Sequence, residues 1–416
     1  MNFDTIIIGG GLSGLITGVS LSKKGQKCLI ISSGQSALHF FSGSFELYGC
    51  KGNPLEAIAR LDSSHPYGKL GVDTVRSLAE RVPSLFKEMN ITLRGSAERN
   101  HYRVTPLGLL KPAWLTVDEY LRVENPQQTH WKRVAILNID GFLDFQPNFV
   151  ASSLAKQGID SVVVNLTLPE LERLRNNPTE MRATNIAKAL VGETLEHLAC
   201  EINAASKDFE AVLMPTVVGL MDGAAVEELK KMVNKPLHFI ATVPPSVPGI
   251  RTQITLRKYF QELGGVYMLG DTVESGVIEN GRVQSIRTAN HGSMEFKARN
   301  FVLATGSFFS HGIIATSERI YEPIIGLDID ASGVRSEWYD RNLFNAQPYM
   351  NFGVATDAEF RVSKQGQTLS NMYAVGAVLS GCNSIKEGSG AGVSILTSLY
   401  VADKILNKQA EEYGAE

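Results

Sequence analysis

Cysteine is scarce in this sequence and is nowhere clustered. Its 416 residues include four cysteines, which form neither a CxxC pair nor a Cys/His pattern with the spacing of a zinc or iron–sulfur site. We therefore predict no metal site and no disulfide framework. Thiols this few and this scattered favour a reducing, cytoplasmic setting.

Long apolar runs and a dominant charge are also missing. Every apolar stretch falls short of the roughly 18 residues that span a bilayer, and the first residues lack the basic region of a signal peptide. The net charge of −3 provides no global basic field for nucleic acid or anionic lipid. We expect a protein without its own membrane span, peripheral to a membrane only through a partner.

The start of the chain has the pattern of a βαβ unit. Residues 3–9 form a continuous apolar run, which is typical of a parallel strand covered on both faces. Residues 12–24 are expected to form a helix and residues 27–32 a second strand. Residues 35–52, rich in Ser, Gly and aromatic residues, are expected to form a loop.

Three glycines separate that first strand from the helix. Gly9, Gly11 and Gly14 form a GxGxxG motif in the position where it binds dinucleotides. The first glycine permits a tight turn, the second lets the backbone approach a pyrophosphate, and the third lets helix and strand pack closely. The helix N-terminus then presents free N–H groups and partial positive charge to an anion.

The middle of the chain predicts an α/β domain inserted into the first one. Its alternating pattern predicts strands at 133–139, 159–169, 209–219 and 236–244, and helices at 148–158 and 227–233. We assign residues 70–241 to this inserted domain. Residues 1–69 and 242–416 then form one Rossmann-like, doubly wound domain that is split in sequence.

The last third of the chain supplies further strand–turn units. A helix at 249–265 precedes a β-meander with a turn at Asn280-Gly281, and two strands end in turns, one containing Thr305 and Gly306 and the other Gly376. The final helix opens on Gly388, Gly390 and Gly392. A helix N-terminus with such small residues suits close approach to a flavin ring and stabilises its anionic reduced form. This pattern favours flavin over nicotinamide.

Several longer stretches carry a specific resemblance. The combination resembles the FAD-dependent oxidoreductase family that includes succinate dehydrogenase flavoproteins. Over nearly the whole chain, "FDTIIIGGGLSGLITG", "SGQSALHFFSGS", "RVTPLG", "LRNNPTEMRATNIA", "PPSVPGIR", "LATGSFFS" and "PIIGLD" resemble the family of B subunits of anaerobic glycerol-3-phosphate dehydrogenases.

This resemblance implies an activity, partners and a cofactor. It implies oxidation of sn-glycerol 3-phosphate to dihydroxyacetone phosphate, with electrons passed through quinone to fumarate or nitrate. The implied partners are the A subunit, a second and catalytic flavoprotein, and the C subunit, a membrane-attached iron–sulfur protein that would hold this chain at the inner face of the cytoplasmic membrane. The implied cofactor is FMN, with FAD as the alternative.

Two carboxylates usual in such flavoproteins are absent. The acid that would hold the adenosine ribose is replaced by Ser32-Ser33, and a second acid expected near the ribityl chain is replaced by Ala377. Loss of the ribose acid removes one charge-assisted hydrogen bond, worth about 1.5–3 kcal/mol. An intact pyrophosphate turn favours FAD, because FMN has no pyrophosphate. The missing acids weaken the case for ordinary FAD binding, and FMN follows from the resemblance.

The remaining candidates concern substrate and ring contacts. Oxidising a secondary alcohol needs a base and cations for the substrate phosphate, for which we predict His311 and Arg251, with Arg257 and Arg319 as further cations. Contacts to the flavin are predicted for Ser33, Gln35, Ser36, Ser42 and Gly43. A polar cluster at Asn176, Asn177, Glu180 and Arg182 is interpreted as a helix cap in preference to a docking surface. Two alternatives stay open, namely a nicotinamide-dependent oxidoreductase and a non-catalytic docking protein with a degenerate flavoprotein fold.

Overall fold

The structure is a computed structural model that describes residues 2–126 and 131–414. The chain forms two compact units. Unit 1 comprises Met1–Ala37, Glu46–Val82 and Leu256–Glu416, and unit 2 comprises Leu38–Phe45 and Pro83–Thr255. The predicted domain boundaries fall just before α4 (Val72–Glu88) and α10 (Val247–Glu262). In the structure, the chain passes from one unit to the other within each of these two helices.

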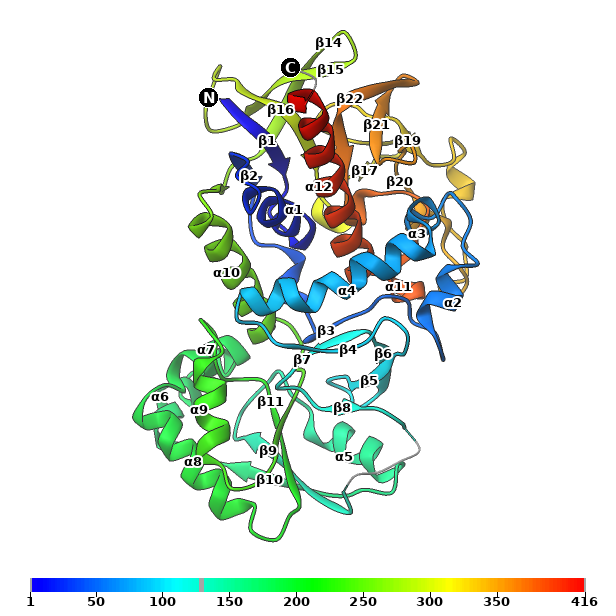
Figure 1. Cartoon of the computed structure of the whole chain (residues 1–416). Coiled ribbons are helices and arrows are strands. Elements are labelled where there is room, and N and C mark those ends of the chain that lie inside the picture. The colour runs from blue at the N-terminus through cyan, green and yellow to red at the C-terminus, as the bar shows by residue number, and fades with distance from the viewer. Residues whose placement is uncertain (1, 127–130, 415–416) are drawn as a thin grey trace. The chain divides into compact units, whose positions relative to one another are not determined.

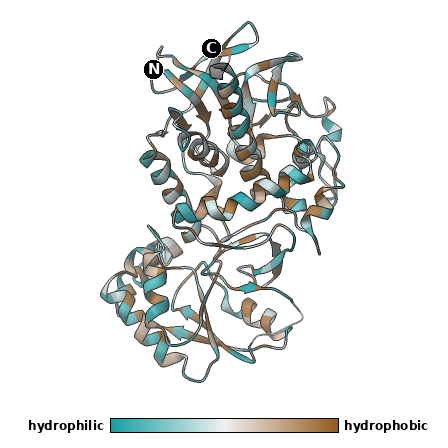
Figure 2. Ribbon diagram, in the orientation of Figure 1, coloured by the Kyte–Doolittle hydropathy of each residue, from teal (hydrophilic) through white to brown (hydrophobic). Residues whose placement is uncertain are grey.

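The central layer of unit 1 is a parallel sheet. Its strand order is β13-β2-β1-β16-β22, formed by Val266–Leu269, Cys28–Ser32, Asn2–Ile8, Phe296–Leu303 and Gln367–Ala374. Most residues of the central strands are apolar and buried, which Figure 2 shows as brown ribbon. Because the strands are parallel, their carboxyl ends meet at one edge, where such sheets bind ligands.

Helices cover one side of this sheet. α1 (Leu12–Ser22) packs along α12 (Gly390–Gly414), and Figure 1 shows the two helices side by side. A Cβ on Gly18 of α1 would lie 2.9 Å from the Phe260 ring of α10. A glycine is needed here because the two helices approach too closely for any side chain.

An antiparallel meander continues from β16. β15 (Arg282–Thr288) pairs with β16 and with β14 (Val273–Glu279). Asn280 and Gly281 join the two strands with φ of +50° and +70°, as a two-residue hairpin of this composition requires. The predicted Asn280-Gly281 turn and the antiparallel pairing around it are confirmed, whereas the first strand of the predicted meander, β13, pairs in parallel with β2. Unit 1 also contains α2 (Pro54–Ile58), α3 (Pro66–Leu70), α11 (Ser384–Glu387), β17 (Ile314–Ala315), β18 (Ile320–Tyr321), β19 (Ile329–Asp330), β20 (Gly353–Val354) and β21 (Arg361–Lys364).

Unit 2 contains a second parallel sheet. Its order is β10-β9-β11-β12, formed by Asp160–Leu166, Arg133–Ile139, Ala211–Pro215 and Leu237–Ile240. The crossover connections contain α5 (Pro147–Ala155), α6 (Glu172–Arg175), α7 (Ala183–Ala189), α8 (Glu193–Ala205) and α9 (Ala224–Met232). All four strands and both helices predicted for this region are present, with ends that differ by a few residues.

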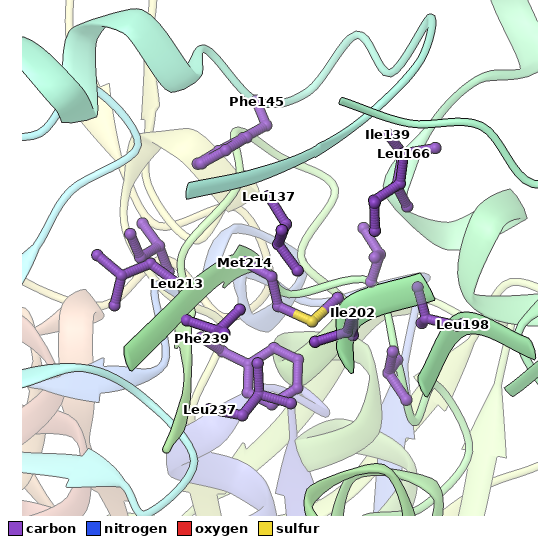
Figure 3. Close-up of a cluster of buried hydrophobic side chains, with 14 of the residues drawn as sticks. Leu137, Ile139, Phe145, Leu166, Leu198, Ile202, Leu213, Met214, Leu237 and Phe239 are labelled. Carbon is purple, nitrogen blue, oxygen red and sulfur yellow. The ribbon is translucent and has the colours of Figure 1, made fainter. Parts of the chain in front are cut away.

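The core of unit 2 forms where this sheet meets its helices. Leu137 of β9, Met214 of β11 and Phe239 of β12 are almost completely buried, and Ile202 of α8 packs against the same cluster. Figure 3 shows these side chains converging. This arrangement explains the continuous apolar runs of the strands, because in a parallel sheet packed between helices the residues on both faces are apolar.

Two small antiparallel sheets complete unit 2. One has the order β3-β7-β4, with Ser44–Phe45, Leu115–Val117 and Leu93–Gly95, and the other the order β6-β5-β8, with Leu110–Ala113, His101–Val104 and Arg122–Val123. The expectation of an unbroken loop over 35–52 was wrong at β3. The ring of Phe45 packs edge-on against Phe86, and this buried contact holds the segment in a strand.

Candidate functional site

The turn between β1 and α1 is built around two glycines. Gly9 has φ of +116°, and a Cβ there would lie 2.2 Å from the carbonyl oxygen of Ala304. A Cβ on Gly14 would lie 1.9 Å from the carbonyl oxygen of Gly9. These two glycines are therefore required by the fold itself, for the tight turn and for the close approach of α1 to β1.

Gly11 has a different environment. It is the N-cap residue of α1 in an ordinary extended conformation, and a Cβ there would meet only the Cβ of Ser36, at 3.8 Å. Packing among the described residues does not require a glycine at this place. The first N–H groups of a helix have no intrahelical acceptor, so the open space at Gly11 suits an anionic group at the helix N-terminus.

Two further turns lie at the same edge of the sheet. Gly306, after β16, has φ of +80°, and the neighbouring Thr305 hydroxyl is buried without a hydrogen-bond partner among the described residues. Gly376, after β22, has φ of +75°, and a Cβ there would lie 2.0 Å from the Ser13 hydroxyl in the first turn of α1. The structure thus brings these residues together with the glycine turn. The unsatisfied Thr305 hydroxyl and the open Gly11 fit a ligand bound at this edge.

The structure describes both places where a carboxylate is missing. Ser32 is buried at the end of β2, and its hydroxyl donates to the carbonyl oxygen of Gly34 at 3.0 Å. Ser33 and Gln35 have exposed side chains, and so does Ala377 beside Gly376. No carboxylate replaces the ribose acid at Ser32; the serine hydroxyl instead closes the local turn.

A tyrosine that no motif identified stands beside the glycine turn, together with Arg257, one of the predicted cations. The Tyr267 hydroxyl, from β13, donates to the carbonyl oxygen of Gly10 at 3.2 Å. The guanidinium of Arg257 lies over the Tyr267 ring, 5.7 Å from its centroid. Only the strand order β13-β2-β1 brings Tyr267 to this turn, so a sequence pattern gives no signal for it.

The final helix, α12, begins at Gly390 and not at Gly388, which is the left-handed C-cap residue of α11. Close packing explains the small residues around this junction. The Gly392 N–H donates to the carbonyl oxygen of Glu46 at 2.9 Å, and a Cβ on Gly392 would lie 2.2 Å from the Tyr67 hydroxyl. Added Cβ atoms on Gly388 and Gly390 would lie 3.2 Å from Gly49 and Ser384 respectively. Flavin contacts at these three glycines stay a prediction.

A buried histidine–glutamate pair fixes the segment before α12. Nδ1 of His65 accepts the Tyr67 N–H at 3.0 Å, which leaves Nε2 to carry the proton and donate to Glu387 at 3.1 Å. Glu387 also accepts the Asn383 N–H and the Ser389 hydroxyl, both at 3.0 Å. Burial would raise the pKa of Glu387, but these hydrogen bonds outweigh burial and hold that pKa below its ordinary value.

This pair gives a prediction for acid stability. Because the pKa of Glu387 is lower in the folded chain than in an unfolded one, near 4.3, its carboxylate stabilises the fold above that pH. The stabilisation is lost as pH falls through the folded-state pKa. We expect Glu387→Gln to remove this part of the pH dependence, measured as free energies of unfolding in urea between pH 3 and 7. Parallel profiles for variant and wild type would contradict the assignment.

The two predicted catalytic residues have contrasting surroundings. His311 is exposed, in the left-handed conformation, and follows Ser310, whose hydroxyl donates to the Thr305 carbonyl oxygen at 2.7 Å. Arg251 of α10 is buried in unit 2, where it forms an ion pair with buried Glu119 and donates to the Gly219 carbonyl oxygen at 2.8 Å. Their catalytic roles stay predictions, and the contacts of Arg251 are structural.

The other predicted residues are spread over both units. Arg319 is exposed over the ring of Tyr321, 4.8 Å from its centroid. Ser42 and Gly43 belong to unit 2, where a Cβ on Gly43 would lie 2.6 Å from the ring of Tyr120. The polar cluster in unit 2 forms local contacts: the Asn177 amide donates to Glu180 at 2.9 Å, and Arg182 pairs with the buried carboxylate of Asp144.

None of the four cysteines forms a disulfide among the described residues. Burial raises the pKa of Cys28 and of Cys382 to about 12, so these two stay protonated at neutral pH. Within residues 2–126 and 131–414, no group of three His, Cys, Asp or Glu side chains is arranged to hold a metal ion. In the same part of the chain, none of the helices combines the length and hydrophobicity needed to cross a bilayer.

Comparison with known proteins identifies the family of this chain. A family model described as an FAD binding domain matches residues 4–393, so the chain belongs to the FAD-binding flavoproteins. A curated relative from Yersinia enterocolitica, named as the B subunit of anaerobic glycerol-3-phosphate dehydrogenase, is 43% identical over 98% of this chain and 99% of its own. A relative of the same name from Pectobacterium carotovorum is 38% identical over 98% and 99%. Within the flavoproteins, the chain therefore belongs to the family of these B subunits.

Among solved structures, the 3-ketosteroid delta1-dehydrogenase from Sterolibacterium denitrificans is 11% identical and covers 98% of this chain and 100% of its own, with a TM-score of 0.46. The family match and the parallel sheets with their helices confirm the predicted α/β flavin-binding fold. The chain is a flavin-dependent oxidoreductase subunit, and the name of its relatives implies a complex of several subunits.

Proposed function

We propose that unit 1 binds FAD and that the chain takes part in oxidising sn-glycerol 3-phosphate. The observation that carries the cofactor assignment is the contrast among the turn glycines. At Gly9 and Gly14, neighbouring backbone atoms already occupy the space that a Cβ would need. At Gly11, at the N-terminus of α1, that space is open. That space suits the pyrophosphate of a dinucleotide, and the unsatisfied Thr305 hydroxyl at the neighbouring turn offers a further polar contact.

FMN is the second candidate, favoured by a separate observation. The acid that would hold the adenosine ribose of FAD is replaced by Ser32, whose hydroxyl donates to Gly34, and FMN has no adenosine to hold. The missing acid near the ribityl chain, at exposed Ala377, does not distinguish the two flavins, because both carry that chain. The single phosphate of FMN would suit the same helix N-terminus. Arg257, held against Tyr267 beside Gly10, adds positive charge near that place and favours a phosphate there with either flavin.

In the proposed reaction the substrate is oxidised to dihydroxyacetone phosphate. A bound flavin supplies the two-electron acceptor for the hydride and returns electrons one at a time. Exposed His311, next to the Thr305–Ser310 turn, is the candidate base for the substrate hydroxyl. Exposed Arg319 is a candidate cation for the substrate phosphate. Arg251 is a weaker candidate, because its guanidinium already pairs with Glu119.

We further propose that electrons leave through partner proteins of the same complex. The relatives' name supports a complex, and the scattered cysteines are consistent with one-electron carriers in other proteins. The proposed partners are the A subunit, a second flavoprotein, and the C subunit, an iron–sulfur protein that attaches the complex to the inner face of the cytoplasmic membrane. Quinone, and then fumarate or nitrate, would accept the electrons.

The deciding experiment identifies the flavin. The chain is purified alone and with its partner proteins, each sample is denatured, and released flavin is separated by chromatography before and after phosphodiesterase treatment. We expect FAD, which the enzyme converts to FMN. FMN before treatment would favour the second candidate. Absence of flavin from both samples would contradict the redox role and favour a docking protein with a degenerate fold, as the missing carboxylates suggest.

A further inference from the structure

The last residue of β2 stands where a dinucleotide-binding fold ordinarily carries the acid that binds the adenosine ribose. Here that residue is Ser32, and its side chain faces the glycine turn. A Cβ added to Gly10 would lie 2.6 Å from the Cβ of Ser32 and 2.7 Å from its hydroxyl oxygen. The serine therefore occupies the place of the acid without supplying a carboxylate, and a ribose bound there needs other acceptors.

A second hydroxyl lies at the same point. The Tyr267 hydroxyl oxygen would be 2.1 Å from the same added Cβ on Gly10. The strand order β13-β2-β1 brings the tyrosine there, and the Gly270 N–H, just after β13, donates to the Ser32 carbonyl oxygen at 2.8 Å. The hydroxyl oxygens of Ser32 and Tyr267 thus both lie within 2.7 Å of one point beside the glycine turn. We call these two residues the hydroxyl pair.

Both members of the hydroxyl pair already use their protons. Ser32 donates to the Gly34 carbonyl oxygen at 3.0 Å, and Tyr267 donates to the Gly10 carbonyl oxygen at 3.2 Å. Because a hydroxyl has one proton and two lone pairs, each oxygen is left to act as an acceptor. An ionised carboxylate is likewise only an acceptor. The pair therefore offers what the missing acid would offer, namely two neighbouring oxygens that accept hydrogen bonds from ribose hydroxyls.

The Tyr267 ring is held in place by a cation. The guanidinium of Arg257, from α10, lies 5.7 Å from the ring centroid, and both residues are half-buried. A cation over a tyrosine face is attracted by the ring quadrupole, which fixes the ring and with it the direction of the hydroxyl. The phenol oxygen is thereby positioned before any ligand binds.

Asp271 is the acid that follows β13, and its own N–H donates to the Ser32 carbonyl oxygen at 3.3 Å. Its carboxylate is buried and already has partners. It accepts the Thr272 N–H at 2.8 Å and the Asn290 N–H at 3.1 Å, and it pairs with Nδ1 of His291 at 2.8 Å. With these contacts Asp271 serves the local fold and leaves the ribose to the hydroxyl pair.

We propose that Ser32 and Tyr267 together replace the ribose acid and hold the adenosine ribose of FAD through two neutral hydrogen bonds. This inference rests on the proposed function, because FMN has no adenosine. It makes Tyr267 a residue that determines the preference of the chain for FAD over FMN. It also accounts for an intact pyrophosphate turn in a chain without the acid.

The test compares the affinities of the full-length apoprotein for FAD and for FMN, each measured by fluorescence titration. Tyr267→Phe keeps the ring beneath Arg257 and removes only the hydroxyl. We expect its FAD affinity to fall about three- to tenfold, the effect of one neutral hydrogen bond, with unchanged FMN affinity. Tyr400→Phe on α12 is the matched control, because Lys404 lies over that ring at 5.5 Å. It should bind both flavins like wild type.

Analogues of FAD that lack the adenosine 2′ or 3′ hydroxyl test the contact itself. Wild type should bind at least one analogue more weakly than FAD, because an acceptor of the pair loses its donor. Tyr267→Phe should bind that analogue and FAD equally well, since the tyrosine oxygen is already gone. Ser32→Ala, which removes the other oxygen, should likewise lower the affinity for FAD and leave that for FMN unchanged.

The outcomes separate this inference from the proposed function. A preference for FAD over FMN that Tyr267→Phe leaves unchanged would overturn the inference alone. Equal losses of FAD and FMN affinity in this variant would also overturn it, because the tyrosine would then act on the glycine turn and not on the ribose. Equal wild-type affinities for the two flavins, or binding of neither, would contradict the proposed FAD site and the inference with it.

Discussion

Replacing Arg251 with methionine is expected to destabilise the chain by about 3–5 kcal/mol, because it leaves the carboxylate of Glu119 buried without its cation. Both side chains are more than nine-tenths buried. The substitution also removes the hydrogen bond to the Gly219 carbonyl oxygen. Urea denaturation, followed by a signal from unit 2, measures the change. A loss this large identifies Arg251 as a structural residue of unit 2.

Two controls separate this outcome from loss of a substrate contact. The double variant Glu119→Leu/Arg251→Met should recover most of the stability, because an apolar pair of similar volume replaces a buried ion pair at little cost. Arg257→Met, also on α10, should lower the stability of the fold by only about 0.5–1 kcal/mol, because its described contact is the stacking on Tyr267. An Arg251→Met chain that unfolds like wild type but has a raised KM for glycerol 3-phosphate would restore the predicted substrate role.

Local patterns predicted the elements of both sheets. The continuous apolar runs of β1 and β9 arise because both faces of these strands are buried. The Asn280-Gly281 turn and the glycine turn after β1 arise because the backbone there needs a positive φ. Element ends were less predictable. The apolar runs at 301–308 and 371–381 predicted the two strands that precede the Gly306 and Gly376 turns, but β16 and β22 begin earlier, at Phe296 and Gln367. Their amino ends pair with β15 and β21 in antiparallel extensions that no apolar run marks.

Contacts between residues far apart in the chain could not be predicted from sequence patterns. Arg251 looks like an available cation on a helix until Glu119 is brought to it from a segment far away in the chain. Tyr267 reaches Gly10 only through the order of strands, and Gly392 packs on Glu46 although the two lie at opposite ends of the chain. Spacing predicts which residue types a site needs. Whether a given side chain is already engaged depends on tertiary contacts that spacing does not encode.

The most informative single substitution for the cofactor is Gly11→Val. Gly11 has an ordinary extended conformation, and its Cβ position is open apart from Ser36 at 3.8 Å, so the folded chain tolerates valine with a cost near 1 kcal/mol for the poorer N-cap. The side chain would occupy the space through which the backbone approaches a phosphate. We expect flavin affinity to fall roughly 100-fold or more, about 2.7 kcal/mol, measured by fluorescence titration of the apoprotein.

The same substitution at a neighbouring glycine gives the opposite pattern. Gly14→Val forces a Cβ to within 1.9 Å of the Gly9 carbonyl oxygen, so it should destabilise the fold by several kcal/mol, since overpacking alone costs about 1–3. Gly34→Ala, where a Cβ meets nothing within 4 Å, should change neither stability nor binding. If Gly11→Val retained its flavin affinity, the flavin phosphate would not bind at the N-terminus of α1. A loss of affinity without a loss of stability would separate the glycine that serves the ligand from those that serve the fold.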